Sequence, residues 1–582
     1  MAAVCGSAAV APAAWLKSSW AAADEATGAS AIVFNQLGYL PDAAKFATLR
    51  SPSTNFAVRT LGGVVALQGR PTPVRDDAAS GDPVQIVDFS AVRQPGTYTL
   101  EIDADATKPD PAKPGTIKSA PITIAGSAYR QALRLTMRSY YGQRCGCNVD
   151  LGEGYSHPAC HLSAEFHPTS GKSGAYKNQG GWHDAGDYGR YVVNSGISTG
   201  TLLWAWEIWN GAVHGLALNI PESGGKLPDF LAEIRWNLDW MLSLQDADGG
   251  VWHKQTGENF CAFILPQDDR LISFVIGTGS APYKSTGATA DLAAVAAIAA
   301  RCYGPYDDAY AKSCLDAAKR AYAWASKNPS VTFENPPSIR TGGYGDADCR
   351  DEILWAVAEL WRTTGDDAYR QVFESGVASF RTNGALRVKT PGWNELSSFA
   401  LWTYAMAGRK GASSELLAQI REASVHAAEG LVSNSRQNGY GNTLALSDYG
   451  WGSNGVAGNQ SLQLLVTDRL QKNDAFRQAA AENLHYLVGR NCWDLSWITQ
   501  LGTKAFQHPH HRPSAADNIA APWPGLLSGG PNAHPGDRVA ASLPKQPPMR
   551  MYKDDQAAYS LNEIAINWNA PLVFLLAALN SQ

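Results

Sequence analysis

Short runs of alternating apolar and polar residues fill the chain from residue 31 to about residue 125. Among them are AIVFNQLGYL, VQIVDF and TYTLEI, and turn-forming residues separate one run from the next. A period of two between turn formers is typical of short β-strands, and this spacing predicts a small β-sandwich over residues 31–125. We expect the segment from Asp103 to Lys118 to be a loop that precedes a last strand, PITIA.

From residue 127 to residue 582 the apolar positions recur at a helical period instead. One helix is expected after Pro228, because the apolar residues that follow share one face and proline is tolerated in a first turn. Another is expected to begin at Asn473 or Asp474 and to end before Gly489. We count roughly a dozen helical segments, which predicts an all-α domain. Long loops on such a scaffold usually carry function, and three stand out: 142–189, 247–285 and 490–558.

Composition narrows the class of protein. The 48 Lys and Arg residues and 53 Asp and Glu residues give a net charge of -5, and no basic run would follow a phosphate backbone, so we expect no nucleic-acid partner. No stretch of about 18 apolar residues occurs, so we expect no membrane span. The 19 Trp residues provide flat faces of the kind that stack on sugar rings, although any single Trp is more often part of a core.

Neither the N-terminal residues nor the cysteine content indicates the cellular compartment of the protein. Residues 1–30 are rich in Ala and Ser but lack the charged segment of a signal peptide, so we interpret them as a leader or a disordered N-terminus. Nine Cys, an odd number over a long chain, do not resemble a disulfide scaffold.

Two carboxylates lie three residues apart in the segment GGWHDAGDYGRY, at Asp184 and Asp187. Two Asp separated by Ala-Gly in a tight turn can converge on one water molecule, and the alternative is an ordinary turn. A third carboxylate, Glu563, lies at the expected start of an apolar terminal helix. Aromatic and apolar neighbours would raise its pKa toward that of a working acid, whereas the alternative is a Glu that interacts with the helix dipole. His510 and Arg512, in FQHPHHRPS, offer donors to sugar hydroxyls or belong to a plain polar loop.

Together these stretches resemble glycoside hydrolase family 9, which contains many bacterial and plant cellulases. Around Glu563 the matching residues are Tyr552, Asp554, Tyr559, Ala565, Asn569 and Ala570. The segment SWITQLGTKAFQHPHHR matches a second family motif at Gly502, Lys504, Pro509, His510 and Arg512. The DAGD turn matches as well, and FNQLGYLPD is similar to the immunoglobulin-like domain of one branch of the family.

The resemblance implies an immunoglobulin-like β-sandwich followed by an (α/α)6 barrel of twelve helices over residues 127–582, with a cleft formed by the long loops. It implies an inverting hydrolase of β-1,4-glucans or cello-oligosaccharides, with Asp187 as general base, Asp184 as the residue that helps to hold the water, and Glu563 as general acid. The substrate contacts that it implies are His510, Arg512, Trp451, Tyr559 and Trp568.

The resemblance also implies metal sites. A structural zinc ion would be held by Cys145, Cys160, His161 and His183, a closed tetrahedral set. The alternative is a disulfide from Cys160 to Cys145 or Cys147. Calcium is a further expectation, with the oxygen-rich residues 267–269 as a candidate loop.

Other hypotheses about the function remain open beside the β-1,4-glucan hydrolase. A carbohydrate-binding protein without catalysis would lack the acid or the base, and a zinc hydrolase would need an open position on its metal. Within the family, endoglucanase, cellodextrinase and exo-β-glucosaminidase differ in the loops that block subsites. Because Trp493, Trp497 and Trp568 add bulk and no binding module follows residue 582, we expect exo-like action on short or soluble chains. We expect a monomer that is secreted or periplasmic.

Overall fold

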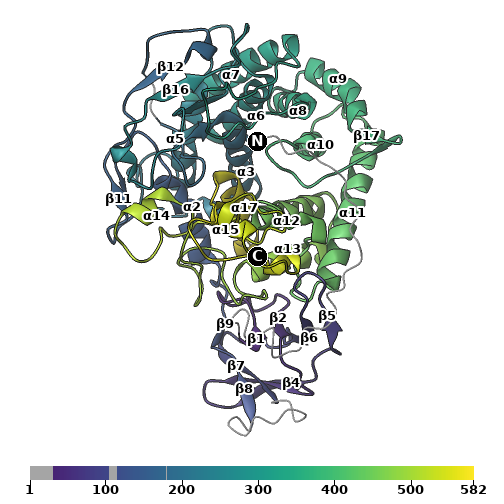
Figure 1. Cartoon of the computed structure of the whole chain (residues 1–582). Coiled ribbons are helices and arrows are strands. Elements are labelled where there is room, and N and C mark those ends of the chain that lie inside the picture. Colours follow the sequence, from purple (N-terminus) through teal and green to yellow (C-terminus); the bar gives the residue numbers. More distant parts are fainter. Residues whose placement is uncertain (1–29, 104–114, 178–179, 582) are drawn as a thin grey trace.

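Two antiparallel sheets face each other in the first part of the chain (Figure 1). The computed structural model describes residues 30–103, 115–177 and 180–581. The first sheet has the order β1-β2-β6-β5, and its strands are β1 (Ile32–Val33), β2 (Phe46–Leu49), β6 (Pro83–Asp88) and β5 (Arg75–Asp76). The second has the order β4-β3-β7-β8 with β9 also on β7, and its strands are β4 (Val65–Gly69), β3 (Phe56–Thr60), β7 (Gly96–Asp103), β8 (Thr116–Lys118) and β9 (Ile122–Ile124).

A core of its own fills the space between these sheets, because alternate residues of each strand point inward. Leu49, Val58, Leu100 and Ile122 are among its buried members. The predicted N-terminal β-sandwich is therefore confirmed. The expected loop from 103 to 118 was wrong at its end, where β8 pairs with the end of β7 and Ile117 covers the core. The predicted leader lies outside the described residues, apart from Ser30.

Twelve helices of ten or more residues follow in the described part of the chain, and outer and inner helices alternate strictly. The outer six are α2 (Arg130–Gly142), α5 (Asp229–Ser243), α7 (Asp308–Lys327), α9 (Asp367–Gly376), α11 (Ser414–Gln437) and α13 (Asp474–Leu487). The inner six are α3 (Val192–Ile208), α6 (Thr286–Tyr303), α8 (Arg350–Thr364), α10 (Ser397–Met406), α12 (Ser453–Leu470) and α17 (Ile566–Asn580). Each inner helix contacts the next, and α17 contacts α3, which closes the ring. The predicted (α/α)6 barrel is confirmed.

The sequence explains which helices lie inside. Outer helices bury one stripe, and four of the six begin at polar caps. In α13 the side chain of Asn473 accepts a hydrogen bond from the Ala475 backbone. Inner helices are buried on nearly all sides, and α6 is rich in alanine, which forms helices readily and lets neighbours approach closely. No helix among the described residues combines the length and the apolar character that crossing a membrane requires.

The long loops carry a sheet that the helical pattern did not predict. Its strand order is β13-β12-β16-β15-β14, with bounds β13 (Ala175–Tyr176), β12 (Ala164–Phe166), β16 (Ser273–Ile276), β15 (Lys254–Thr256) and β14 (Arg190–Tyr191). The loops 142–189 and 247–285 are thus joined by backbone hydrogen bonds over one end of the barrel. Two hairpins are smaller: β10 (Val149–Asp150) with β11 (Ser156–His157), and β17 (Arg381–Thr382) with β18 (Ala385–Leu386).

Candidate active site

The DAGD turn is held from behind by the loop that contains His510 and Arg512. The Arg512 backbone and its Nη1 both donate to the Gly186 carbonyl, at 3.1 and 2.8 Å. A side chain at Gly186 would begin with a Cβ only 1.7 Å from the His510 carbonyl oxygen, so this close approach requires glycine. Two of the sequence motifs, more than 320 residues apart, therefore meet at one point.

The two aspartates of this turn lie in different surroundings. Asp184 is fully buried, and its carboxylate accepts hydrogen bonds from Asn194 Nδ2 and, at 2.6 Å, from Tyr344 Oη. Burial, and to a lesser degree the charge of Asp187, raises the pKa of Asp184 to about 7. Asp187 instead lines a cavity and accepts at Oδ2 alone, from the Gly189 backbone at 3.0 Å and from Tyr191 Oη at 3.3 Å. Within the described residues, this leaves Asp187 Oδ1 for a water molecule.

Glu563 lies across from this turn, in the connection between α16 (Tyr559–Asn562) and α17. It is the residue after α16 and precedes the first residue of α17 by three positions, so the expectation that it starts the terminal helix was wrong. Its backbone is extended and pairs with His510. Burial, followed by the charges of Asp187 and Asp184, raises the pKa of Glu563 to about 8. This carboxyl group is therefore protonated at neutral pH.

Aromatic rings form the wall beside Glu563. Trp451 and Tyr559 are 50% and 36% exposed, and their ring centroids are 5.6 Å apart. The His510 ring lies 5.6 Å from that of Tyr559, and its Nδ1 is 2.8 Å from the Gln556 carbonyl oxygen. Trp568 lies behind this wall, where it packs against Gly452 and the neighbouring glycines. Exposed rings of this kind are suited to stack on pyranose rings.

Arg512 is almost fully buried, and its guanidinium donates to backbone carbonyls, to Gly186 through Nη1 and to Cys261 through Nε and Nη2. The side chain thus holds the DAGD turn. His511, which the sequence did not single out, lies next to it and bonds Gln143 through Nε2 at 3.0 Å. Gln143 in turn donates to the His183 and Ala185 carbonyls, at 3.2 and 3.0 Å.

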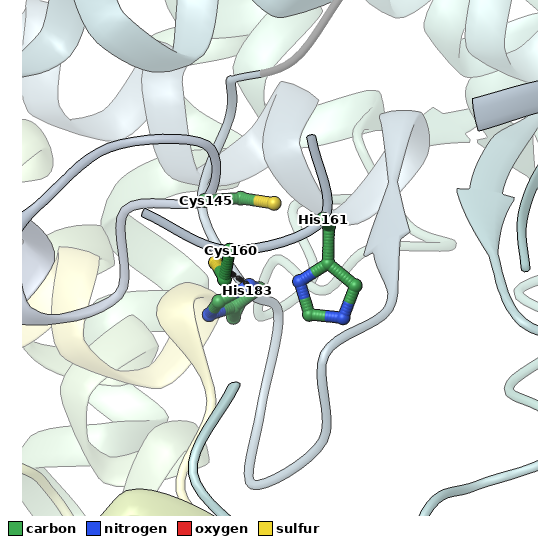
Figure 2. A group of neighbouring side chains, drawn as sticks. All are labelled: Cys145, Cys160, His161 and His183. Carbon is green, nitrogen blue, oxygen red and sulfur yellow. Dashed lines mark hydrogen bonds between the residues drawn. The ribbon is translucent and has the colours of Figure 1, made fainter. Parts of the chain in front are cut away.

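The four residues expected to bind metal come together (Figure 2). One ligand atom from each of Cys145, Cys160, His161 and His183 lies within 4.8 Å of the other three. The thiols of Cys145, Cys147 and Cys160 are free, so neither alternative disulfide is formed. His161 Nδ1 is buried without a hydrogen-bond partner, while Nε2 is 3.3 Å from Asp269 Oδ2. An orphaned ring nitrogen beside two thiols and a second imidazole fits a closed zinc site.

The candidate calcium loop is arranged differently. Asp269 faces His161, and Asp268 accepts a hydrogen bond from Gln267 at 3.2 Å, so the three residues do not share one cage. An acidic group lies elsewhere, between α6 and the start of α8; Asp291, Asp351 and Glu352 are buried in it, and Asp346 is partly exposed. Both carboxylate oxygens of Glu352 and of Asp291 are buried and accept no hydrogen bond from the described residues. Burial and the neighbouring carboxylates raise the pKa of Glu352 well above its ordinary value.

The expectation that Trp493 and Trp497 narrow the cleft was wrong. Trp497 is completely buried against Tyr552, with ring centroids 4.5 Å apart. Trp493 donates through Nε1 to the Met549 carbonyl at 2.8 Å and packs on the same tyrosine. Both rings support the loop before Glu563 through Tyr552. The indole N–H of Trp493 finds an acceptor, whereas Trp497 Nε1 is buried without a hydrogen-bond partner among the described residues.

An acid held protonated opposite an aspartate that lines a cavity, at one end of an (α/α)6 barrel, defines the class of a helical-barrel glycoside hydrolase. A protein-family model for glycosyl hydrolase family 9 matches residues 129–576, and one for the cellulase N-terminal ig-like domain matches residues 27–107. The chain belongs to glycosyl hydrolase family 9.

Individual relatives agree with this. The chain is 36% identical to Endoglucanase D of Acetivibrio thermocellus, over 94% of this chain and 83% of the relative. It is 32% identical to a cellodextrinase of Butyrivibrio fibrisolvens, over 94% of this chain and 99% of the relative. A crystal structure of a zinc-binding triple mutant of a family 9 endoglucanase superimposes with a TM-score of 0.84 and 33% identity, covering 93% of this chain and 99% of that one. The reading as a carbohydrate-binding protein without catalysis is thereby set aside.

Proposed function

We propose that the chain hydrolyses β-1,4-glucan by inversion, with Glu563 as general acid and Asp187 as general base. The observation that carries the proposal is the contrast between the carboxyl groups. Glu563 is protonated at neutral pH beside an exposed indole, whereas Asp187 lines a cavity and accepts hydrogen bonds from protein groups through Oδ2. Inversion requires this division of labour between an acid and a base.

The roles follow from the contacts. Glu563 donates its proton to the glycosidic oxygen as the bond to the anomeric carbon breaks. Asp187 Oδ1 takes a proton from a water molecule that attacks the same carbon from the other face. Asp184 has both oxygens engaged by Asn194 and Tyr344, so it acts by holding the turn and the water rather than as the base.

Substrate contacts are assigned to the exposed wall. Trp451 and Tyr559 would stack on sugar rings, and the free edge of the His510 ring would face hydroxyl groups. Trp568 would support this wall from behind, and Arg512 would act through the turn that it holds. Trp497 is buried and Trp493 is partly buried, so these two rings give little support for exo-like action. We propose internal cleavage, as the name of the endoglucanase relative suggests.

The deciding experiment is proton NMR of the first products from cellotetraose. Inversion gives the α-anomer, and early appearance of the β-anomer would refute the mechanism.

Viscosity of carboxymethyl cellulose tests whether the enzyme cleaves internal bonds or chain ends. Internal cleavage lowers viscosity sharply while few reducing ends form, whereas exo action releases reducing ends with little change in viscosity.

For the metals we propose one zinc ion in the Cys145, Cys160, His161 and His183 group, with a structural role because all four ligands are protein atoms. We also propose that the protein binds calcium, which prefers carboxylate oxygens. Calcium added to chelator-treated protein should raise the melting temperature, and an unchanged melting temperature would refute this proposal.

A polymeric glucan cannot enter a cell intact, so we propose a secreted or periplasmic enzyme. We propose that it acts as a monomer, which light scattering at the concentration of the assay would test.

A further inference from the structure

Lys254, on β15, is a buried lysine whose ammonium is surrounded by neutral oxygen atoms. Its Nζ donates to Asn335 Oδ1 at 2.7 Å, to the Gly342 carbonyl at 2.6 Å and to Thr341 Oγ1 at 3.4 Å. Three acceptors match the three N–H groups of an ammonium ion. Within the described residues, no carboxylate lies within ion-pair distance of it.

The residue before it grips the same segment. His253 is buried, stacks face to face on Phe333 at 3.8 Å between centroids, and has Nε2 2.9 Å from the Gly343 carbonyl oxygen. Two consecutive residues of the β15 region therefore hold two consecutive carbonyls, those of Gly342 and Gly343. A clamp of this kind fixes both the position and the orientation of the segment.

The clamped segment, residues 342–344, reaches both aspartates. The Gly342 backbone N–H donates to Tyr191 Oη at 3.1 Å, and Tyr191 Oη donates to Asp187 Oδ2 at 3.3 Å. A Cβ at Gly342 would lie 3.3 Å from the Tyr191 ring, so the contact is tight. Two residues further on, Tyr344 donates to Asp184.

The charge of Lys254 acts along the same route. Its Nζ lies 5.5 Å from the centroid of the Tyr191 ring, where a cation strengthens the hydroxyl as a donor. Burial lowers the pKa of Lys254 to about 7, and the negative charge of Asp187 opposes that shift. The two groups therefore interact across the Tyr191 ring, without direct contact.

We propose that Lys254 is a positioning residue for the reaction: it holds residues 342–344 against the two aspartates and places its ammonium group beside the ring of Tyr191, which bonds Asp187. This inference rests on the proposed role of Asp187 as general base. Lys254 itself does not touch the substrate, since its N–H groups all bond to the protein.

The test compares Lys254→Met, which removes charge and donors, with Lys254→Gln, which keeps two donors without the charge. Lys45→Met is the matched control, because Lys45 is equally buried and donates to three neutral carbonyls in the β-sandwich, of Pro41, Ala43 and Ser90. On cellotetraose we expect kcat to fall about 100-fold for Met and about 10-fold for Gln, with KM changed less than about threefold. Lys45→Met should lower the melting temperature and keep kcat.

A double-mutant cycle gives the second readout, which stability alone would not move. If Lys254 acts through Tyr191, the fold-loss in kcat of the double variant Lys254→Met/Tyr191→Phe should be much smaller than the product of the fold-losses of the two single variants. Full additivity, or Lys254 variants within about twofold of wild-type kcat, would overturn the inference. Should the Met variant fail to fold, the Gln variant carries the same cycle.

Asp187→Asn belongs in the same series and separates the two possible failures. If it keeps wild-type turnover, the proposed function fails. If it is inactive while both Lys254 variants turn over normally, only the inference about Lys254 fails.

Discussion

Trp451 donates a hydrogen bond from its indole Nε1 to Oε2 of Glu563 at a distance of 3.1 Å. The indole is half exposed, so a residue on the cleft wall contacts the acid directly. A donor to a carboxylate favours its ionised form, and this bond lowers the pKa of Glu563 against the larger effects of burial and of Asp187.

Trp451→Phe keeps an aromatic ring and removes that donor. Because the acid must be protonated to work, we expect the alkaline limb of the pH dependence of kcat to move up by about half a pH unit. Tyr559→Phe is the control, since Tyr559 donates to the Gly536 carbonyl and not to Glu563. A limb that stays in place in Trp451→Phe would show that this bond is absent from the working enzyme.

Glu563→Gln and Asp187→Asn should each lower kcat by about 100- to 10,000-fold, because each removes one proton-transfer group. Circular dichroism, and melting temperature near pH 4.5, should stay close to those of the wild type. Steady-state kinetics on cellotetraose checks this. More than about a tenth of wild-type turnover in either variant would contradict the assigned roles.

The free energy of unfolding should depend on pH because the pKa of Glu563 differs between the folded and the unfolded protein. Between its ordinary pKa of 4.5 and its folded pKa of about 8, the folded protein keeps a proton on Glu563 that the unfolded chain releases. The stability contributed by this group is therefore present below pH 4.5 and is lost as pH rises toward 8. Glu563→Gln removes this loss, so its melting temperature should exceed that of wild type by a few degrees at pH 8.5 and match it near pH 4.5. Glu429→Gln, on the exposed face of α11, should show no such pattern.

Zinc should be present at about one ion per chain in protein purified without added metal. Cys160→Ser should lower the melting temperature and the turnover, because His183 is adjacent to Asp184 and the ion would anchor that end of the turn. Cys147→Ser is the control, since this neighbouring thiol lies outside the group. Elemental analysis decides the question, together with titration of all nine thiols after denaturation and chelation. A zinc-free protein with fewer titratable thiols would contradict the assignment.

The fold could be predicted from the sequence where one spacing of apolar residues continued over a whole helix or strand. Outer helices such as α13 have an apolar stripe and a cap, so both their presence and their ends were predicted. The sheet that joins the loops 142–189 and 247–285 was missed because its strands are only two to four residues long, too short for an alternating pattern to be recognised. Similarly, β8 lies in a segment of turn formers and was expected to be loop.

The candidate site likewise contains residues that the sequence predicted and residues that it did not. Asp184 and Asp187 lie in a recognisable local motif, and the zinc ligands were predicted from the resemblance to the family. Tyr344 contacts the turn from 160 residues away, and Lys254 contacts the supporting residue Gly342 from 88 residues away. No spacing in the sequence signals either contact. Trp497 shows the opposite error, since an aromatic residue in a cleft loop is not exposed when its loop folds under the cleft.

A last prediction concerns the seam between the β-sandwich and the barrel. Asp82 is buried there, forms ion pairs with Arg50 and Arg550, and accepts a hydrogen bond from Tyr440. Arg550 lies two residues before Tyr552, whose Oη donates to Asn562 Oδ1 at 2.6 Å, directly before Glu563 in the chain. The sandwich thus fixes the loop that presents the acid.

Asp82→Ala would remove the ion-pair partner of the buried Arg550 guanidinium, which costs about 3–5 kcal/mol. We expect a lower melting temperature and, because the loop before Glu563 loses its anchor, a lower kcat that is not recovered at temperatures well below the melting transition. Asp42→Ala is the matched control, since Asp42 pairs with Arg93 at 3.9 Å on the exposed surface of the same sandwich. Melting curves and kcat at 20 °C below each transition would check this, and an Asp82→Ala protein that melts early yet turns over normally when folded would show that the sandwich stabilises the barrel without placing the acid.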